Sequence, residues 1–174
     1  MISPAWCRMM AAYNAEMNRR LYAAADTLTD DVRRADGGAF WGSVHGTLSH
    51  LLWGDTTWMS RFDGWPKPPV AQRDSARMVE DWAALKSART AADERISAWA
   101  NHLTEDRLAA PLTWFSGASQ RGMSLPLWVA ASHFFNHQTH HRGQAHALLT
   151  RAGAVTGDTD LPWVVDLPAL GLAP

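Results

Sequence analysis

Residues 133–146 read HFFNHQTHHRGQAH and place five histidines in one strongly helical segment. Two of them, His137 and His141, are four positions apart. On an α-helix this spacing sets two side chains about 40° apart around the axis and about 6 Å apart along it. Two imidazoles on one face can share a metal ion, as in helices that bind zinc. A helix with solvated or hydrogen-bonded histidines and no metal fits the same spacing, so both interpretations stand at this point.

The remaining histidines of this segment point in different directions. At about 100° per residue, His133 and His140 lie about 40° and 60° to one side of His137. By the same rotation, His146 lies on the opposite side of the helix. Gln144 lies about 20° from His137, where it can support a ligand through a hydrogen bond. We therefore expect Gln144, His133 and His140 to support or line the site.

The residue after His137 argues against one class of zinc enzyme. Peptidases of the H-E-x-x-H type need a glutamate there as general base, and this chain has Gln138. An amide cannot take up a proton at neutral pH. The inverted H-x-x-E-H pattern also fails, because its fourth position is His140. The sequence does not predict peptide hydrolysis of either type.

The composition is that of a globular protein with one core. The chain has 174 residues, is 47% hydrophobic and 19% charged, and carries a net charge of −1. We expect a single domain over residues 1–174. No cluster of Lys and Arg stands out, so we expect no nucleic-acid partner. The single cysteine, Cys7, and the lack of a signal peptide or long apolar run predict a cytoplasmic protein without membrane contact.

Apolar residues at helical spacing predict four helices. They cover about residues 4–28, 43–62, 74–103 and 124–153. Pro126 falls in the first turn of the last helix, and Gly153 ends it. The expected N-caps of the second, third and fourth helices are Ser43, Asp74 or Ser75, and Ser124.

Four amphipathic helices without strong strand alternation predict an all-α protein, a four-helix bundle. The second and third connections are long enough to cross the bundle. Residues 111–115 (PLTWF) and 123–125 (MSL), on either side of Gly117, suggest a small hairpin before the last helix.

A catalytic metal normally has a third protein ligand, and His50 is the candidate from another helix. It lies away from the apolar face of the second helix. Small residues beside a histidine leave room for a ligand, but a surface histidine among solvent-facing residues fits the same pattern. The stripe around His50 consists of Ser43, Gly46, Gly54 and Thr57.

Three other side chains near these helices are poorer ligand candidates. Asp55 lies near the apolar face and is expected to be a buried, paired carboxylate. His45 lies about 140° around the helix from His50 and should not share its site. His102, at the end of the third helix, is expected to act as a charge partner of the helix C-terminus.

Read in order, these segments resemble the DinB-like (DinB/YfiT) family of metal-binding four-helix bundles, over nearly the whole chain. The stretch NHQTHHRGQ at 136–144 is the most specific part of the likeness. The other stretches that carry it are AYNAEMNRRLY at 12–22, SVHGTLSHLLWGD at 43–55, PLTWFS at 111–116, MSLPLW at 123–128 and TDLPWV at 159–164.

The resemblance implies a metal held by three histidines, which by position are His50, His137 and His141. It places Arg142 and Gly143 in the HRG element of the family, where Arg142 points off the ligand face and is expected to be structural. It also implies that the middle helices of the bundle are parallel. Members often form dimers, so a homodimer is a further expectation.

Characterised members include transferases that use bacillithiol, mycothiol or glutathione, and a thiol-dependent maleylpyruvate isomerase. An open three-histidine site can bind a thiol and lower its pKa. We therefore expect a metal-dependent thiol S-transferase or a related enzyme, with a small-molecule substrate and a low-molecular-weight thiol as cosubstrate. The alternatives are a metal-dependent hydrolase and a non-catalytic metal-binding bundle. Zn, Ni, Mn and Fe all accept imidazole ligands, and the sequence identifies no catalytic residue beyond the ligands.

Overall fold

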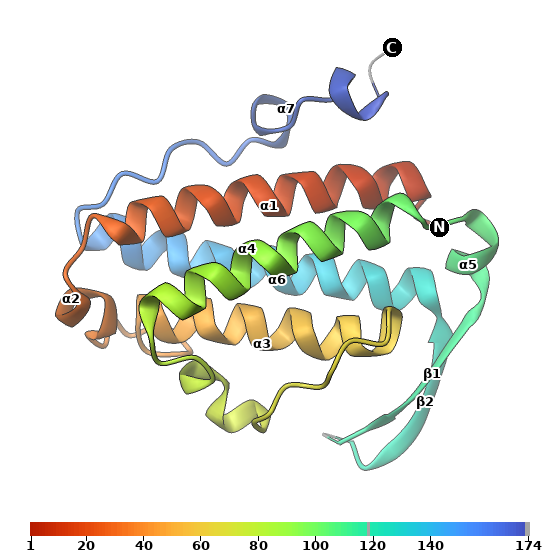
Figure 1. Cartoon of the computed structure of the whole chain (residues 1–174), viewed down its shortest axis with the longest axis horizontal. Helices are drawn as coiled ribbons and strands as arrows, with labels where there is room; N and C mark the ends of the chain where they lie inside the picture. The colour runs from red at the N-terminus through yellow and green to blue at the C-terminus, as the bar shows by residue number, and fades with distance from the viewer. Residues whose placement is uncertain (118, 173–174) are drawn as a thin grey trace.

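Four long helices carry the structure, a computed structural model that describes residues 1–117 and 119–172 (Figure 1). They are α1 (Pro4–Asp26), α3 (Val44–Phe62), α4 (Trp82–Asn101) and α6 (Leu127–Arg151). The shorter elements are α2 (Asp30–Arg34), η1 (Gln72–Arg77), α5 (Glu105–Ala109), β1 (Pro111–Ser116), β2 (Arg121–Pro126), α7 (Leu161–Val164) and η2 (Pro168–Leu170). The predicted four-helix bundle with a hairpin before its last helix is confirmed.

The directions of the helices can be followed in Figure 1. Helices α3 and α4 run the same way along the bundle, whereas α1 and α6 run the opposite way. α1 packs against α4 and α6, and α3 packs against the same two helices. The chain therefore crosses the bundle diagonally from α1 to α3 and again from α4 to α6. The connection between α3 and α4, which contains η1, brings the chain back to the end where α3 began.

Two of the predicted helix boundaries are confirmed. Ser43 precedes α3, and its Oγ accepts the backbone N–H of Gly46 at 3.0 Å. This bond satisfies one of the donors that a helix start leaves without a partner. The last long helix, α6, is followed by Gly153. The φ angle of this residue is 84°, a left-handed conformation that glycine adopts without strain.

The predicted start of the third helix is wrong. Asp74 and Ser75 lie in η1, and α4 begins at Trp82 behind the N-cap Asp81, whose carboxylate accepts from the backbone N–H of Ala84 at 2.7 Å. Ser75 does not cap a helix, because η1 packs on α3. The carbonyl oxygen of Ser75 accepts from Oγ of Ser49 at 2.8 Å.

The predicted cap of the fourth helix is also wrong. Ser124 lies in β2, where it pairs with Thr113 of β1. Helix α6 begins only after Pro126, and the backbone N–H of Leu127 donates to the carbonyl oxygen of Ala110 at 2.9 Å. The antiparallel pairing of β1 and β2 thus continues up to the residue that precedes α6.

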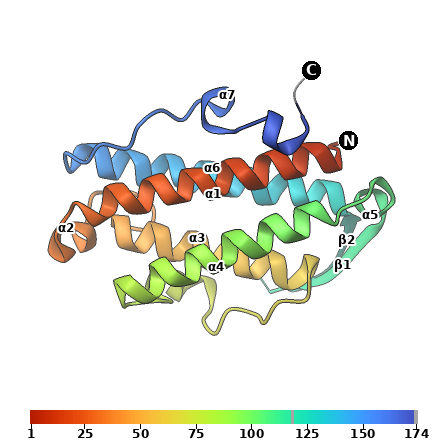
Figure 2. The same cartoon turned by 45° about the horizontal axis from the view of Figure 1, so that its top comes forward.

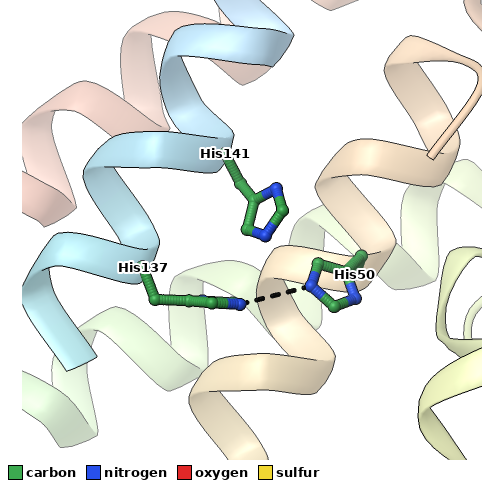
Figure 3. A group of neighbouring side chains, drawn as sticks. All are labelled: His50, His137 and His141. Carbon is green, nitrogen blue, oxygen red and sulfur yellow. Dashed lines mark hydrogen bonds between the residues drawn. The ribbon is translucent and has the colours of Figure 1, made fainter. Parts of the chain in front are cut away.

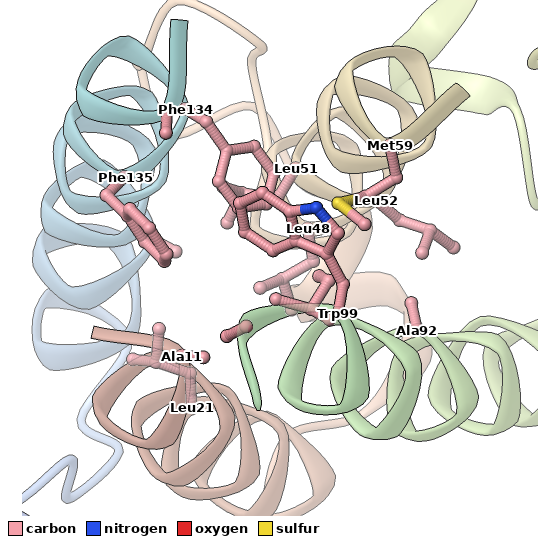
Figure 4. Close-up of a cluster of buried hydrophobic side chains, with 14 of the residues drawn as sticks. Ala11, Leu21, Leu48, Leu51, Leu52, Met59, Ala92, Trp99, Phe134 and Phe135 are labelled. Carbon is pink, nitrogen blue, oxygen red and sulfur yellow. The ribbon is translucent and has the colours of Figure 1, made fainter. Parts of the chain in front are cut away.

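The core fills the space between the four long helices (Figure 4). Phe62 stacks on Trp99 with ring centroids 5.2 Å apart, and Phe134 meets the edge of Phe62 at 5.7 Å. Such aromatic pairs add about 0.5–1.5 kcal/mol each to the burial of their surface. Cys7 also lies in the core, and burial raises its pKa to about 12, so this thiol acts as a packing group.

A buried polar layer crosses the same core. Asp55 of α3 is 1% exposed and pairs with Arg89 of α4 at 2.6 Å, as expected from its place near the apolar face. The second oxygen of Asp55 accepts from Nε2 of Gln138 on α6 at 2.8 Å. Arg89 also pairs with Asp93, which accepts from Asn18 of α1. Side chains from all four long helices therefore meet in one network of charges and hydrogen bonds.

The C-terminal segment folds back over α1 (Figure 2). Tyr13 and Met17 of α1 form a small apolar cluster with Val165, and the hydroxyl of Tyr13 donates to the carbonyl oxygen of Thr159 at 2.6 Å. The tail thereby covers an outer face of the bundle. Among the described residues, no helix has the length and apolar character that crossing a membrane would require.

Candidate metal centre

Three histidines from two facing helices converge on one point (Figure 3). His50 comes from α3, and His137 and His141 come from successive turns of α6. One ring nitrogen of each lies within 4.8 Å of those of the other two. The Nε2 atoms of His50 and His137 are 3.3 Å apart. His50 and His141 are buried and His137 is half-buried, so the cluster lies largely inside the protein.

The approach of His137 depends on a glycine in α3. His137 places its ring directly against Gly54, where a Cβ would lie 2.6 Å from Cε1 of the ring. Any side chain at this position would push the imidazole away from α3. The small residue one turn after His50 therefore allows the two helices to bring their histidines together.

The outer nitrogens of two histidines are held by polar side chains. Nδ1 of His141 donates to Oε1 of Gln144 at 2.7 Å, and Nδ1 of His50 lies 2.8 Å from Oγ of Ser75. With a proton on Nδ1, the lone pair of each imidazole sits on Nε2 and points into the cluster. Hydrogen bonds of this kind fix the ring orientation and tautomer of histidine ligands.

The environment keeps the three imidazoles neutral. Burial, together with the nearby rings of the other histidines, lowers the pKa of His50 to about 3 and that of His137 to about 4. Burial also lowers the pKa of His141, against the opposing effect of Gln144. A metal binds imidazole in its neutral form, so these side chains are ready to act as ligands at neutral pH.

The residues fit a divalent metal ion. With metal–nitrogen bonds of about 2.0–2.1 Å, tetrahedral geometry separates two ligand nitrogens by about 3.4 Å, close to the Nε2 separation of His50 and His137. The donor set is three neutral nitrogens, and in the described part of the chain this group contains no carboxylate or thiol. Three protein ligands and at least one open position are typical of catalytic rather than structural sites.

Two tryptophans form an aromatic wall beside His50. Trp41, in the connection before α3, stacks on its ring with centroids 3.9 Å apart, and Trp53 stacks at 5.6 Å. These rings hold His50 in place and reduce the access of water to it. The sequence showed many tryptophans, but no local pattern connected Trp41 with His50, because the stacking requires the turn that precedes α3.

Gln144, His133 and His140 lie around the cluster in different ways. Gln144 supports His141, as described, and its Nε2 lies 3.3 Å from Nε2 of His140. His140 is exposed, and its ring meets the edge of His141 with centroids 4.9 Å apart. His133 is also exposed and lies one turn before His137, with ring centroids 5.9 Å apart.

The remaining histidines lie outside the cluster. His45 is buried and its Nε2 bonds to the carbonyl oxygen of Val79 at 2.8 Å. Nδ1 of His102 bonds to the carbonyl oxygen of Ala98 at 2.7 Å, at the C-terminus of α4. His146 faces the tail, and its Nε2 lies 2.7 Å from Oγ1 of Thr156.

The sequence predicted the role of Arg142 but not that of Ser75. Arg142 is buried, with its guanidinium carbon 5.4 Å from the ring centre of Tyr13, which agrees with a structural role away from the cluster. Ser75 supports His50, although the sequence suggested only a helix cap. The contact between Ser75 and His50 joins residues 25 positions apart, and helical periodicity in the sequence gives no sign of it.

Comparisons with known proteins bear on the family and the fold of the chain. A family model described as the DinB family matches residues 1–169. The solved structure of YfiT from Bacillus subtilis, described as a probable metal-dependent hydrolase with an unusual four-helix bundle topology, superposes with a TM-score of 0.61. The two sequences are 17% identical, and the match covers 89% of this chain and 92% of YfiT. At this identity the likeness shows a shared fold.

A second solved structure is a DinB-like protein from Bacillus cereus. It matches with a TM-score of 0.49 and 19% identity, over 82% of this chain and 89% of that protein. No curated protein matches the chain.

Proposed function

This chain belongs to the DinB family, and from that premise we propose that it is a metal-dependent enzyme that activates a low-molecular-weight thiol for S-transfer. The observation that carries the proposal is the convergence of His50, His137 and His141, with ring nitrogens within 4.8 Å of one another. These three histidines are the proposed ligands. A divalent metal held there would act as a Lewis acid and lower the pKa of a bound thiol or water.

The side chains of the site suit a thiol nucleophile, which a metal can activate without a carboxylate as general base. His50, His137 and His141 are neutral and add no negative charge to the centre. Trp41 and Trp53 provide an apolar wall beside it, against which the carbon skeleton of an organic thiol can pack. The resemblance to thiol-dependent members of the family points the same way.

The test combines metal analysis with spectroscopy. Purified protein should contain or take up close to one divalent metal per chain. After substitution with Co²⁺, a sulfur-to-metal charge-transfer band should appear when bacillithiol, mycothiol, glutathione or a simple thiol is added. A chain that takes up no metal contradicts the whole proposal. If the chain binds Co²⁺ and no thiol changes its spectrum, the transferase form is rejected.

A metal-dependent hydrolase is the second candidate, and His133 is the observation that favours it. This histidine lies beside His137 and keeps part of its surface exposed, and the partial burial of its ring, together with the nearby charge of Arg61, lowers its pKa. It is therefore neutral at pH 7 and can accept a proton from an attacking water. The description of YfiT as a probable metal-dependent hydrolase belongs to that protein, and it motivates the same test here.

The two candidates differ in their need for His133. A hydrolase should act on a panel of esters and amides, and His133→Gln should lower its rate at least tenfold while the metal content stays constant. A thiol transferase should keep most of its rate in the same variant, because the pKa of its thiol is lowered without a protein base. Lack of turnover in both assays would favour the non-catalytic metal-binding bundle.

A further inference from the structure

Arg61 sits between two tryptophans at the end of α3. The guanidinium carbon lies 4.3 Å from the ring centre of Trp58, one turn earlier in the same helix. It also lies 5.4 Å from the ring centre of Trp114, which belongs to β1. The two indoles meet edge-to-face with centroids 5.7 Å apart. The arginine is therefore held by aromatic contacts between the bundle and the hairpin.

Arg61 has no acidic partner in the part of the chain that the structure describes. Its side chain is half-buried, and burial lowers its pKa with no carboxylate to oppose that effect. Buried Arg89, in contrast, pairs with both Asp55 and Asp93. A cation that is partly removed from water without a counter-ion costs free energy. No described residue accepts a hydrogen bond from Arg61, so the five donors of its guanidinium can bind an anion from outside the chain.

A continuous row of side chains leads from Arg61 to the three-histidine cluster. Trp58 lies against His133 with ring centroids 4.9 Å apart, and His133 lies 5.9 Å from His137. On α3 itself, His50 and Arg61 are eleven residues apart, a spacing that returns to about the same face after three turns. Helical side chains also lean toward the N-terminus, which brings the guanidinium back toward His50.

We propose that Arg61 is the residue that recognises a carboxylate of the substrate, whose reacting end lies at His50, His137 and His141. The guanidinium matches a carboxylate through two parallel hydrogen bonds, and the indoles of Trp58 and Trp114 hold it in the required plane. The substrate class is a small organic acid that spans from the histidine cluster to the hairpin. This inference rests on the proposed function for the reacting end, but the recognition of the carboxylate itself does not require a metal.

The test uses two matched pairs of probes. The first pair is 4-mercaptophenylacetate and its amide, which carry a thiol for the centre and differ only in charge at the other end. The second pair is phenylacetate and phenylacetamide, which lack the thiol. Binding is measured by quenching of tryptophan fluorescence, with zinc-loaded protein and again after chelation. Without metal, a preference for the acid reports on the protein side chains alone.

The variants are Arg61→Gln, Arg61→Lys and the control Arg95→Gln. Arg95 also stacks on a tryptophan, with its guanidinium carbon 3.9 Å from the ring centre of Trp65, but it lies outside the histidine cluster and its aromatic neighbours. A general loss of cation–π stabilisation should therefore affect both positions. A loss of preference for the acid should occur only at Arg61.

Wild-type and Arg95→Gln proteins should bind each acid about tenfold more tightly than its amide, a difference of about 1.4 kcal/mol. Arg61→Gln should reduce this ratio to near one, and Arg61→Lys should retain part of it, because an ammonium group keeps the charge but not the paired donors. Equal binding of acid and amide by the wild type overturns the inference, even if Arg61→Gln fails to fold.

The probes also separate this inference from the proposed function. If metal-free protein prefers phenylacetate but no thiol binds the loaded protein, carboxylate recognition stands and the thiol proposal fails. If thiols bind the loaded protein but acids and amides bind alike, the proposed function stands and the role of Arg61 is rejected.

Discussion

Gly54 lies directly beneath the imidazole of His137, so close that a Cβ at residue 54 would lie 2.6 Å from Cε1 of the ring. Gly54→Ala should therefore displace His137 from its position opposite His50. The loss of one well-placed ligand should weaken zinc binding by about 10–100-fold, as changes around metal ligands do. Competition with a chromophoric chelator measures this affinity, while circular dichroism checks that the helices persist.

Gly143→Ala is the matched control on α6. A Cβ at Gly143 meets no atom within 4 Å, although this residue is only two positions from His141. Replacement of a glycine inside a helix by alanine stabilises the helix by about 0.5–1 kcal/mol. Gly143→Ala should keep its zinc affinity and melt slightly higher. Equal zinc affinities in the two variants would contradict the role given to Gly54.

The histidines of α6 should separate into two groups when each is replaced by alanine. His137→Ala and His141→Ala should lose the metal, and with it the stabilisation that a bound ligand provides, about 4 kcal/mol at a thousandfold excess over its Kd. His146→Ala should keep the metal, since His146 faces Thr156 of the tail. EDTA should lower the melting temperature of the wild type but hardly affect His141→Ala.

His140→Ala is the sharper control in that series. His140 is next to His141 in sequence, yet it is exposed and only supports the cluster from outside through Gln144. This variant should retain close to one metal per chain by elemental analysis. Loss of metal from His140→Ala together with retention by His141→Ala would show that the ligand assignment on α6 is wrong.

Acid should destabilise the metal-free protein through its buried histidines. Burial lowers the pKa of His50 to about 3 and of His137 to about 4, whereas a histidine in the unfolded chain titrates near pH 6.5. Between about pH 6.5 and pH 4 the unfolded state therefore binds more protons than the folded state. The stability that these neutral histidines contribute is present above pH 6.5 and is lost as the pH falls.

The contribution of one histidine can be isolated by comparing variants. In urea titrations with chelator, His137→Gln should show a shallower loss of stability over this pH range than the wild type. Each proton taken up only on unfolding changes the slope by about 1.4 kcal/mol per pH unit. Most other titratable groups cancel in the comparison, and His50, whose pKa His137 helps to lower, changes the slope in the same direction. Identical slopes would mean that His137 is not shielded from protonation.

The buried charge layer should be costly to break from one side. Arg89→Met leaves Asp55 and Asp93 without their shared cation inside the core, which should lower the free energy of unfolding by about 3–5 kcal/mol. The control is Arg77→Met, because Arg77 pairs with Glu80 on the surface and should cost less than about 1 kcal/mol. Urea denaturation measures both, and comparable losses would contradict a special role for the buried layer.

Local signals in the sequence predicted most of the long helices. Ser43 lies before an apolar run and Gly153 follows one, and both mark helix ends in the structure. The starts of α4 and α6 are the exceptions. At α6 the predicted cap, Ser124, lies in β2. At α4, Asp74, Ser75 and Asp81 all have the chemistry of an N-cap. Which of them caps the helix depends on η1 packing on α3, a contact between distant segments that helical periodicity does not report.

In the candidate site, too, the sequence predicted the features that depend on local geometry and missed those that depend on contacts between distant segments. The spacing of His137 and His141 within one helix predicted that their side chains share a face, since only local geometry is involved. The sequence left two interpretations of His50 open, because a stripe of small residues suits both a ligand site and a solvent-facing surface. The stacking of Trp41 and the hydrogen bond from Ser75 could not be predicted, since both depend on how connections outside the helices fold back.

The positions of the proposed ligands on α3 and α6 have a consequence for the order in which the site forms. His50 and His137 are 87 positions apart, and the whole of α4 and the hairpin lie between them. During synthesis, α3 emerges long before the residues that would complete its coordination. A nascent chain that stops short of α6 carries only one of the three histidines. The three-histidine set is therefore complete only once this long loop has closed, and binding of a metal to all three histidines would be thermodynamically linked to assembly of the bundle.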